Sequence, residues 1–411
     1  MRNLSPERGE ILYSPGRQPR GENINHIEPC RGGITNKKSR KGFENTMKND
    51  THKQDIKQPL TPRQRALAVI ERKTPPVLAS TFKATEEVDR QMMAHFGVSD
   101  VEDIIKPLGV CYLHWPWKHI APATIRNYRE ENGVKYDVMG VGRREVKYDG
   151  GSYLEYVHHP LAFAETIADV EKYNWPKPEN FDYSNIIAEC EKYRDVALSI
   201  TSWTLFEQSW ALRGFEQFLI DLATNEKMAT AIIRHVEEYN WQVITRIYEI
   251  AKDHVQFFGT GDDFGSQESL LMSLDMWKKY FLPGYKRAYD YGRSRGLHTW
   301  MHCDGNVKQL IPFLIDAGLE ILDPLMPMID DMSPYKIIPE YGRHLCFHGT
   351  IDVQRLLPFC TEQEVRNEVQ KQMKTLWSRG GLYMAPSHCI QPGTPLKNIL
   401  AAYEELNKFA P

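Results

Sequence analysis

The sequence predicts a single (β/α)8 barrel, an α/β fold in which eight parallel strands alternate with helices. Eight short apolar runs are separated by helix-like segments, and the separations suit crossover helices better than hairpins. Neither GxGxxG after a strand nor GxxxxGK[ST] occurs, which leaves a nucleotide-binding sheet without support. The predicted strands cover residues 77–82, 110–115, 196–201, 255–261, 297–302, 321–326, 344–348 and 382–387.

Residues 1–59 differ from the rest of the chain. They are rich in Arg, Lys, Gly, Asn and Pro and lack apolar periodicity, which predicts a disordered basic and polar tail. The segment also lacks the apolar core of a secretory signal. Met47 opens a stretch that resembles a natural start, so residues 1–46 are either a misassigned upstream extension or a real tail with a docking role.

The barrel domain is predicted to cover residues 60–411. Thr61 and Pro62 begin its first helix, and Thr361 with Glu364 forms a capping box before a late one. Between about residues 122 and 160 the pattern changes to two β-rich runs, 134–138 and 141–148. These runs predict an antiparallel hairpin inserted into the barrel, where it would cap one end.

Bulk composition excludes several classes of protein. The chain has 411 residues, 26% of them charged, and a net charge of -3, which gives no reason to expect nucleic acid as a partner. No apolar run approaches the roughly 20 residues of a membrane-spanning helix. The seven cysteines are odd in number and contain no CxxC, a pattern typical of reduced thiols. We therefore expect a soluble, cytoplasmic protein.

Polar side chains gather just after the predicted strands, where barrels carry their function. Acids, imidazoles and thiols on one rim indicate a metal or acid–base site. The residues are Trp203, Glu207, Asp262, Asp263, Gln267, His302, Cys303, Asp304, Asp323, His348, Asp352, Ser387, His388, Cys389 and Gln391.

The run His302-Cys303-Asp304 is the strongest candidate. Side chains alternate along a strand, so His302 and Asp304 share a face while Cys303 points away. With Cys389 from the last strand's loop, the pair would offer one N, one O and one S ligand and an open fourth position, as in catalytic zinc sites. Such a zinc would bind a thiolate or polarise a leaving group.

Structural interpretations of the same residues stay open. Cys303 suits helix packing better than ligation, and Asp304 before a glycine suits a turn. Asp262 and Asp263 could cap the loop that follows them. Asp323-Pro324 could be only the start of a turn. His348 and His388 could be structural histidines held by hydrogen bonds.

Five motifs together resemble the uroporphyrinogen decarboxylase superfamily, which includes cobalamin-dependent methyltransferases. The resemblance runs from about Thr61 to the C-terminus and implies a (β/α)8 barrel. The motifs are Thr61-Pro62-Arg63-Gln64-Arg65-Ala66-Leu67, Gly259-Thr260-Gly261-Asp262-Asp263-Phe264-Gly265, His302-Cys303-Asp304-Gly305-Asn306, Phe347-His348-Gly349-Thr350-Ile351-Asp352 and Ala385-Pro386-Ser387-His388-Cys389-Ile390-Gln391-Pro392.

The two branches of the superfamily imply different residues. The decarboxylase has an Arg-rich run, Met-Arg-Gln-Ala-Gly-Arg, for substrate carboxylates, whereas this chain reads Phe82-Lys83-Ala84-Thr85-Glu86-Glu87. The methyltransferases place zinc at His-x-Cys after one strand and at a Cys after the last. His302 and Cys389 match, but Asp304 stands where the family has its first Cys, so a metal-free site also stays open.

The resemblance implies methyl transfer between a small methyl donor, or a thiol or folate acceptor, and a cobalamin held by a corrinoid protein as partner. His302, Asp304 and Cys389 would hold zinc, Asp262, Asp263, His348 and Gln391 would act on the substrate, and Trp203, Glu207 and Asp352 would contact the cofactor. Two alternatives are decarboxylation of a tetrapyrrole or smaller carboxylated compound, and a barrel that binds a corrinoid or tetrapyrrole without catalysis.

Overall fold

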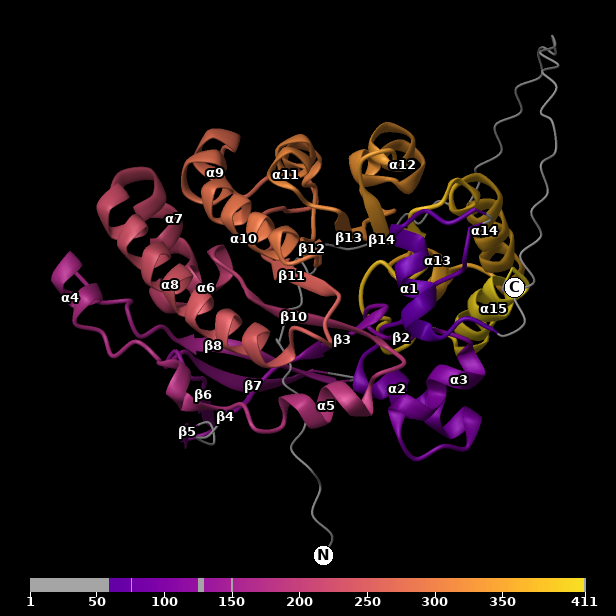
Figure 1. Ribbon diagram of the computed structural model, residues 1–411, viewed down its shortest axis with the longest axis horizontal. Coiled ribbons are helices and arrows are strands. Elements are labelled where there is room, and N and C mark those ends of the chain that lie inside the picture. The colour runs from indigo at the N-terminus through magenta and orange to yellow at the C-terminus, as the bar shows by residue number, and fades with distance from the viewer. Residues whose placement is uncertain (1–58, 75, 125–128, 149–150, 410–411) are drawn as a thin grey trace, which may run out of the picture.

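A curled sheet of parallel strands forms the centre of the molecule (Figure 1). The computed structural model of the chain describes residues 59–74, 76–124, 129–148 and 151–409. The predicted tail, except Pro59, therefore lies outside the described residues, as does Met47. The strands of the ring are β1 (Thr81–Phe82), β2 (Tyr112–Leu113), β3 (Trp117–Ile120), β10 (Ala197–Trp203), β11 (Phe257–Gly261), β12 (His298–His302), β13 (Ile321–Leu325), β14 (Cys346–Gly349) and β15 (Leu382–Tyr383).

The second barrel strand changes its neighbour along its length. Its first part, β2, pairs with β1, and its second part, β3, pairs with β10. His114 takes a positive φ of 63° between the two parts, and Pro116 has no amide proton for a sheet hydrogen bond. Because the predicted run ended at residue 115, its continuation to Ile120 is a correction.

The ring closes between its first and last strands. Ser80 and Met384 form a parallel bridge, so β15 joins β1, and the predicted barrel of eight parallel strands is confirmed. The first and last strands are shorter than predicted, because only β1 and β15, two residues each, keep a regular ladder there.

Helices surround the ring on its outside (Figure 1). Thr361 forms the predicted capping box, and Thr61, predicted to begin the first helix, forms one as well. The helices are α1 (Pro62–Ile70), α2 (Glu86–Phe96), α3 (Ile105–Leu108), α4 (Ile167–Glu171), α5 (Ile186–Lys192), α6 (Phe206–Arg213), α7 (Phe215–Thr224), α8 (Glu226–Ala251), α9 (Leu274–Tyr280), α10 (Leu282–Ser294), α11 (Ile311–Ala317), α12 (Pro334–Tyr341), α13 (Leu356–Phe359), α14 (Glu362–Thr375) and α15 (Leu396–Asn407). None of these described helices has the length and apolar character needed to cross a membrane.

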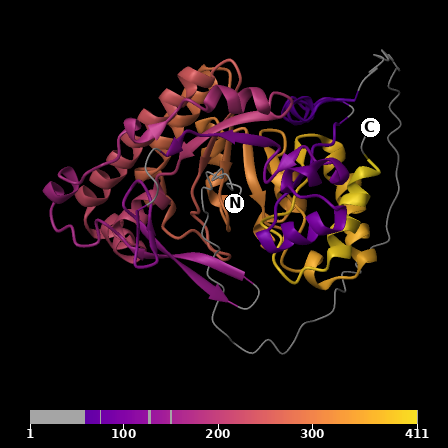
Figure 2. The same ribbon diagram turned by 90° about the horizontal axis from the view of Figure 1, so that it is seen from below.

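The predicted insertion is an antiparallel sheet of four strands rather than two. Its strands are β5 (Arg129–Glu131), β6 (Val134–Tyr136), β7 (Gly142–Tyr148) and β8 (Gly151–His158), and Figure 2 shows β7 and β8 as a projecting ribbon. A further short pair, β4 (Ala123–Thr124) with β9 (Phe181–Asp182), frames the insertion.

A buried arginine joins the end of the insertion to the barrel. Arg213 on α6 donates to the carbonyls of Leu161 at 2.7 Å and Ala164 at 2.8 Å, and its Nε is 2.7 Å from Asp221 Oδ2. The ion pair is almost fully shielded from solvent. The insertion is therefore anchored on the helix that follows β10.

Aromatic side chains fill the lower interior of the ring. Trp117 stacks on Phe257 with ring centroids 4.5 Å apart, and Trp300 and Tyr383 lie beside them. These side chains close the barrel below, so polar chemistry is confined to the carboxyl ends of the strands.

Candidate active site

Two glycine-containing loops meet at the carboxyl ends of β11 and β12. A Cβ on Gly305 would lie 2.4 Å from the backbone carbonyl of Gly265, and Gly305 has a φ of +90°. A side chain at either glycine would push the loops apart. The contact is why the two motifs Asp262-Asp263-Phe264-Gly265 and Asp304-Gly305-Asn306 can place their acids side by side.

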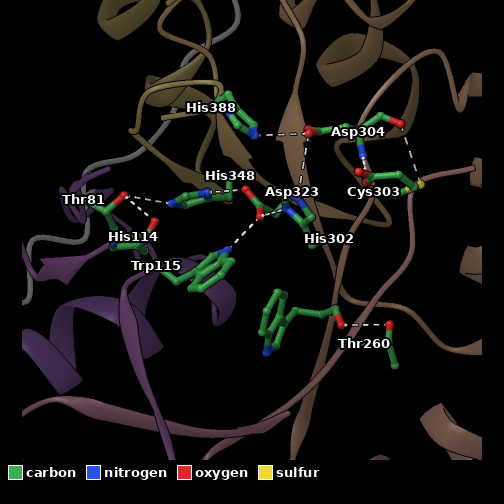
Figure 3. Close-up of polar contacts among 12 residues, drawn as sticks. Thr81, His114, Trp115, Thr260, His302, Cys303, Asp304, Asp323, His348 and His388 are labelled. Carbon is green, nitrogen blue, oxygen red and sulfur yellow. Dashed lines mark hydrogen bonds and ion pairs between the residues drawn. The ribbon is translucent and has the colours of Figure 1, made fainter. Parts of the chain in front are cut away.

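Three side chains from these loops form a group that could hold a metal ion. Asp263, His302 and Asp304 offer ligand atoms that all lie within 4.8 Å of one another. The amide of Asp304 donates to Asp263 Oδ1 at 2.8 Å, and His302 Nε2 lies 3.9 Å from Asp304 Oδ2 (Figure 3). His302 and Asp304 thus come together as strand alternation predicts, whereas Cys303 is buried in the core behind them.

Asp323 on β13 fixes the orientation of His302. Its Oδ2 accepts hydrogen bonds from His302 Nδ1 and from Trp115 Nε1, both at 2.7 Å (Figure 3). Nδ1 donates its proton to Asp323, so Nε2 faces Asp304. Burial acts to lower the pKa of His302, but the charges of Asp304 and Asp323 outweigh it and raise the value, so a metal at Nε2 would displace a proton. A carboxylate behind a histidine in this way is the usual support of a metal-ligating imidazole. Sequence analysis placed Asp323 on the rim, with a turn as its structural alternative, but did not predict that it supports His302.

His348 is held within the same network. Its Nδ1 lies 2.6 Å from Asp323 Oδ1, and its Nε2 lies 3.0 Å from the Thr81 hydroxyl (Figure 3). Both nitrogens are therefore engaged, which favours the structural interpretation over direct contact with substrate. Charge and hydrogen bonds from the two histidines outweigh burial and hold the pKa of Asp323 well below its usual range.

Carboxyl groups crowd around the proposed metal ligands. Burial raises the pKa values of Asp263 and Asp304, and the charge of Asp304 raises that of Asp263 further. Burial and the charge of Asp263 raise the pKa of Glu207 well above its usual range. A bound cation would relieve this repulsion.

Lys83, at the end of β1, is a second residue that sequence reasoning passed over. Its ammonium lies 5.2 Å from the ring centre of Trp115. Burial acts to lower the pKa of Lys83, but Cys389, Asp323 and Asp304 outweigh it and raise the value. Only its position after a strand end could have drawn attention to it, because a single lysine has no distinctive spacing.

Asp262 has a structural position, in contrast to Asp263 beside it. Its carboxylate accepts the amides of Leu205 at 2.7 Å, Phe206 at 3.0 Å and Glu207 at 2.6 Å, and the hydroxyl of Tyr285. These bonds tie Asp262 to the start of α6 and to α10, and its predicted role on the substrate stays a prediction. It brings Glu207 toward Asp263.

Other predicted residues lie away from this group. Trp203 is fully buried and packs against Trp241 with ring centroids 4.4 Å apart, and its predicted contact with a cofactor stays a prediction. Asp352 is used by its own turn, where it accepts the amides of Gln354 and Arg355. Gln391 is exposed and bonds the carbonyl of Cys389 at 3.1 Å.

The loop after β15 reaches the group through a histidine. His388 Nε2 lies 3.5 Å from Asp304 Oδ2 (Figure 3). Cys389 is half-buried and interacts electrostatically with Lys83, and it is not among the three grouped metal-capable residues. In place of Cys389, the structure brings Asp263 to His302 and Asp304.

Comparisons with known proteins agree with this architecture. The profile of the family described as Uroporphyrinogen decarboxylase (URO-D) matches residues 139–409. A methyltransferase from Methanosarcina mazei has a similar structure, with a TM-score of 0.60 and 15% identity over 85% of this chain and 99% of that one. The YdhT protein from Bacillus subtilis is a more distant match, with a TM-score of 0.40 and 11% identity over 84% of this chain and 91% of that one. Curated protein sequences gave no significant match.

Proposed function

The chain belongs to the uroporphyrinogen decarboxylase (URO-D) family, and within this family we propose that it moves a methyl group between a small donor or acceptor and a cobalamin carried by a partner protein. The observation that carries the proposal is the grouping of Asp263, His302 and Asp304 in front of Asp323. The fold shared with a methyltransferase is consistent with it.

The three grouped residues fit a divalent metal. Asp304 Oδ1 is buried and has no hydrogen-bond partner among the described residues, an arrangement that is costly unless a ligand completes it. One imidazole nitrogen and two carboxylate oxygens suit zinc and similar ions. When bound, zinc would hold a thiol acceptor as thiolate or polarise a leaving group.

The surrounding residues prepare the site before any metal binds. Asp323 holds the His302 ring so that Nε2 faces Asp304. Lys83 offsets part of the negative charge without occupying a ligand position. The corrinoid partner and the contact of Glu207 with the cofactor rest on the family resemblance.

A metal-binding measurement tests the ligand set. Full-length protein is stripped with a chelator, and its zinc affinity is measured by competition for the wild type, D263N, D304N and C389S, with D330N as control because Asp330 is exposed. Loss of a carboxylate that binds the metal should weaken binding by at least the roughly 10- to 100-fold typical of residues that only support a ligand, while C389S and D330N stay near wild type. Strong loss in C389S with none in D263N would restore Cys389 as the third ligand.

A turnover measurement tests the reaction. Consumption of methylcobalamin with a simple thiol, followed by its visible spectrum, should require zinc and should fall in D304N. If the purified protein binds no stoichiometric zinc and D304N turns over like wild type, the metal part of the proposal is wrong.

Decarboxylation is the second candidate, and one observation favours it. Lys83 places a buried cation at the end of β1, near where the decarboxylase has its arginine run. Direct turnover of uroporphyrinogen, abolished by K83M, would decide for decarboxylation.

A further inference from the structure

His119 faces the interior of the ring with no hydrogen-bond partner among the described residues. Both of its ring nitrogens are shielded from solvent, and neither has a partner. The residue lies on β3, in register with Ser199 of β10. An imidazole has one donor and one acceptor when neutral, so two hydrogen-bonding positions are left over.

Aromatic side chains position this ring. His119 meets Trp115 edge to face with centroids 4.6 Å apart, and it lies 5.3 Å from Trp300. These contacts fix the ring plane without using its nitrogens. A histidine kept only for packing would be replaced by an apolar ring at no loss, because buried polar atoms without partners are unfavourable.

Trp115 links His119 to the grouped metal-capable residues. Trp115, which contacts His119, donates to Asp323, the residue that orients His302. Lys83 lies over the indole of Trp115. A small molecule beside His119 would therefore touch the same indole that borders His302, whose ring centre is 6.2 Å from that of Trp115.

The electrostatic surroundings select the kind of atom that His119 could bind. Burial, followed by the charges of Lys118 and His114, lowers the pKa of His119 to about 3. Lys83 acts in the same direction, and only Asp323 opposes it among its main neighbours. The neutral imidazole keeps one N–H donor, and the Lys83 ammonium over the neighbouring Trp115 ring favours an electron-rich oxygen as its partner.

We propose that His119 is a substrate-binding residue that donates a hydrogen bond to a carboxylate or carbonyl oxygen of the small molecule, next to the grouped Asp263, His302 and Asp304. This inference rests on the proposed function for the identity of the site as a substrate site. It names a ligand chemistry, an oxygen acceptor, for the side of the barrel interior that Trp115 lines.

Three variants of the full chain separate this role from packing. H119F keeps an aromatic ring beside Trp115 and Trp300 but removes both nitrogens. H119Q restores one donor and one acceptor. H344F is the matched control, because His344 is exposed ahead of β14.

Tryptophan fluorescence reports binding, since Trp115 and Trp300 contact His119. Acetate and acetamide are titrated at constant ionic strength. Wild type and H344F should give saturable changes, H119F should bind at least about tenfold more weakly, and H119Q should recover part of the affinity, consistent with one lost hydrogen bond to a charged group. Binding of both probes would indicate a carbonyl, and binding of acetate alone would indicate a carboxylate.

Thermal melting supplies the structural control. H119F should melt at or above the wild-type temperature, because it removes buried atoms without partners. The proposal is overturned if wild type binds neither probe, if H119F binds as wild type does, or if H119Q fails to recover binding while H119F melts more than about 2 °C lower. None of these readouts needs zinc or methyl transfer, so their failure is distinct from that of the proposed function.

Discussion

Replacement of Asp323 by asparagine should damage both the stability of the barrel and its affinity for metal. The carboxylate accepts three buried hydrogen bonds, from His302, His348 and Trp115, at 2.6–2.7 Å. Asparagine has one acceptor oxygen and turns an NH2 group toward the remaining donor or donors. If the asparagine oxygen keeps His302 and Trp115, its NH2 group faces His348 Nδ1, which can accept only after His348 changes tautomer.

The magnitude follows from the number of bonds affected. Hydrogen bonds to charged groups contribute about 1.5–3 kcal/mol each, and leaving one member of a buried charged pair without its partner costs about 3–5 kcal/mol. We therefore expect D323N to lower the free energy of unfolding by about 3–5 kcal/mol. Zinc affinity should fall about 10- to 100-fold, because His302 would no longer be fixed in its tautomer.

Urea unfolding of metal-free protein and chelator competition measure the two effects. D316N is the control, since Asp316 is an exposed carboxylate on α11. If D323N unfolds within about 0.5 kcal/mol of wild type and binds zinc equally well, Asp323 does not orient His302.

Three further perturbations follow from the described contacts. G305A should lower the free energy of unfolding in urea by about 2–3 kcal/mol, because its Cβ would lie 2.4 Å from backbone atoms. G97A is the control, since Gly97 also has a positive φ but has open space, and it should lose less. Equal losses would contradict the loop contact. R213M leaves Asp221 buried without its cation and should lower the free energy of unfolding by about 3–5 kcal/mol. Adding D221N to R213M should recover part of that loss, and no recovery would show that the ion pair does not stabilise the fold. Burial depresses the pKa of His119 to about 3 in the folded protein, whereas the unfolded chain binds a proton there near pH 6.5. The free energy of unfolding should therefore fall as pH is lowered from about 6.5 toward 3. H119F should therefore show a shallower acid dependence, by at most about 1.4 kcal/mol per pH unit, and an unchanged slope would show that His119 does not titrate there.

The sequence was sufficient for the barrel because its strands are apolar runs at crossover spacing. It was insufficient where geometry departs from a regular strand. The second strand was predicted to end at residue 115, because His114 and Pro116 interrupt the apolar run before β3 resumes. The insertion was predicted as one hairpin, which corresponds to β6 and β7. β8 lies beyond the two predicted runs, and β5 was missed because it is polar and exposed and is a strand only through its pairing with β6.

The candidate site divides in the same way. Alternation along one strand placed His302 with Asp304, a local property that the sequence contains. The third metal-capable residue is Asp263, whereas Cys389 was predicted. Asp263 reaches His302 because two loops meet at Gly265 and Gly305, a contact between segments far apart in the sequence. Asp262 and Asp263 look equivalent in sequence, yet only the fold directs one at α6 and the other at His302.

The side of the ring that carries Lys83, Trp115 and His119 is also the side with the fewest sheet hydrogen bonds. β1, β2 and β15 contain two paired residues each, whereas β10 to β12 pair over five or more. Local opening is governed by such differences in hydrogen bonding. Within the barrel, amide hydrogen exchange should therefore be fastest in β1, β2 and β15. The barrel would open first beside His119, while the strands that hold His302 and Asp263 stay closed.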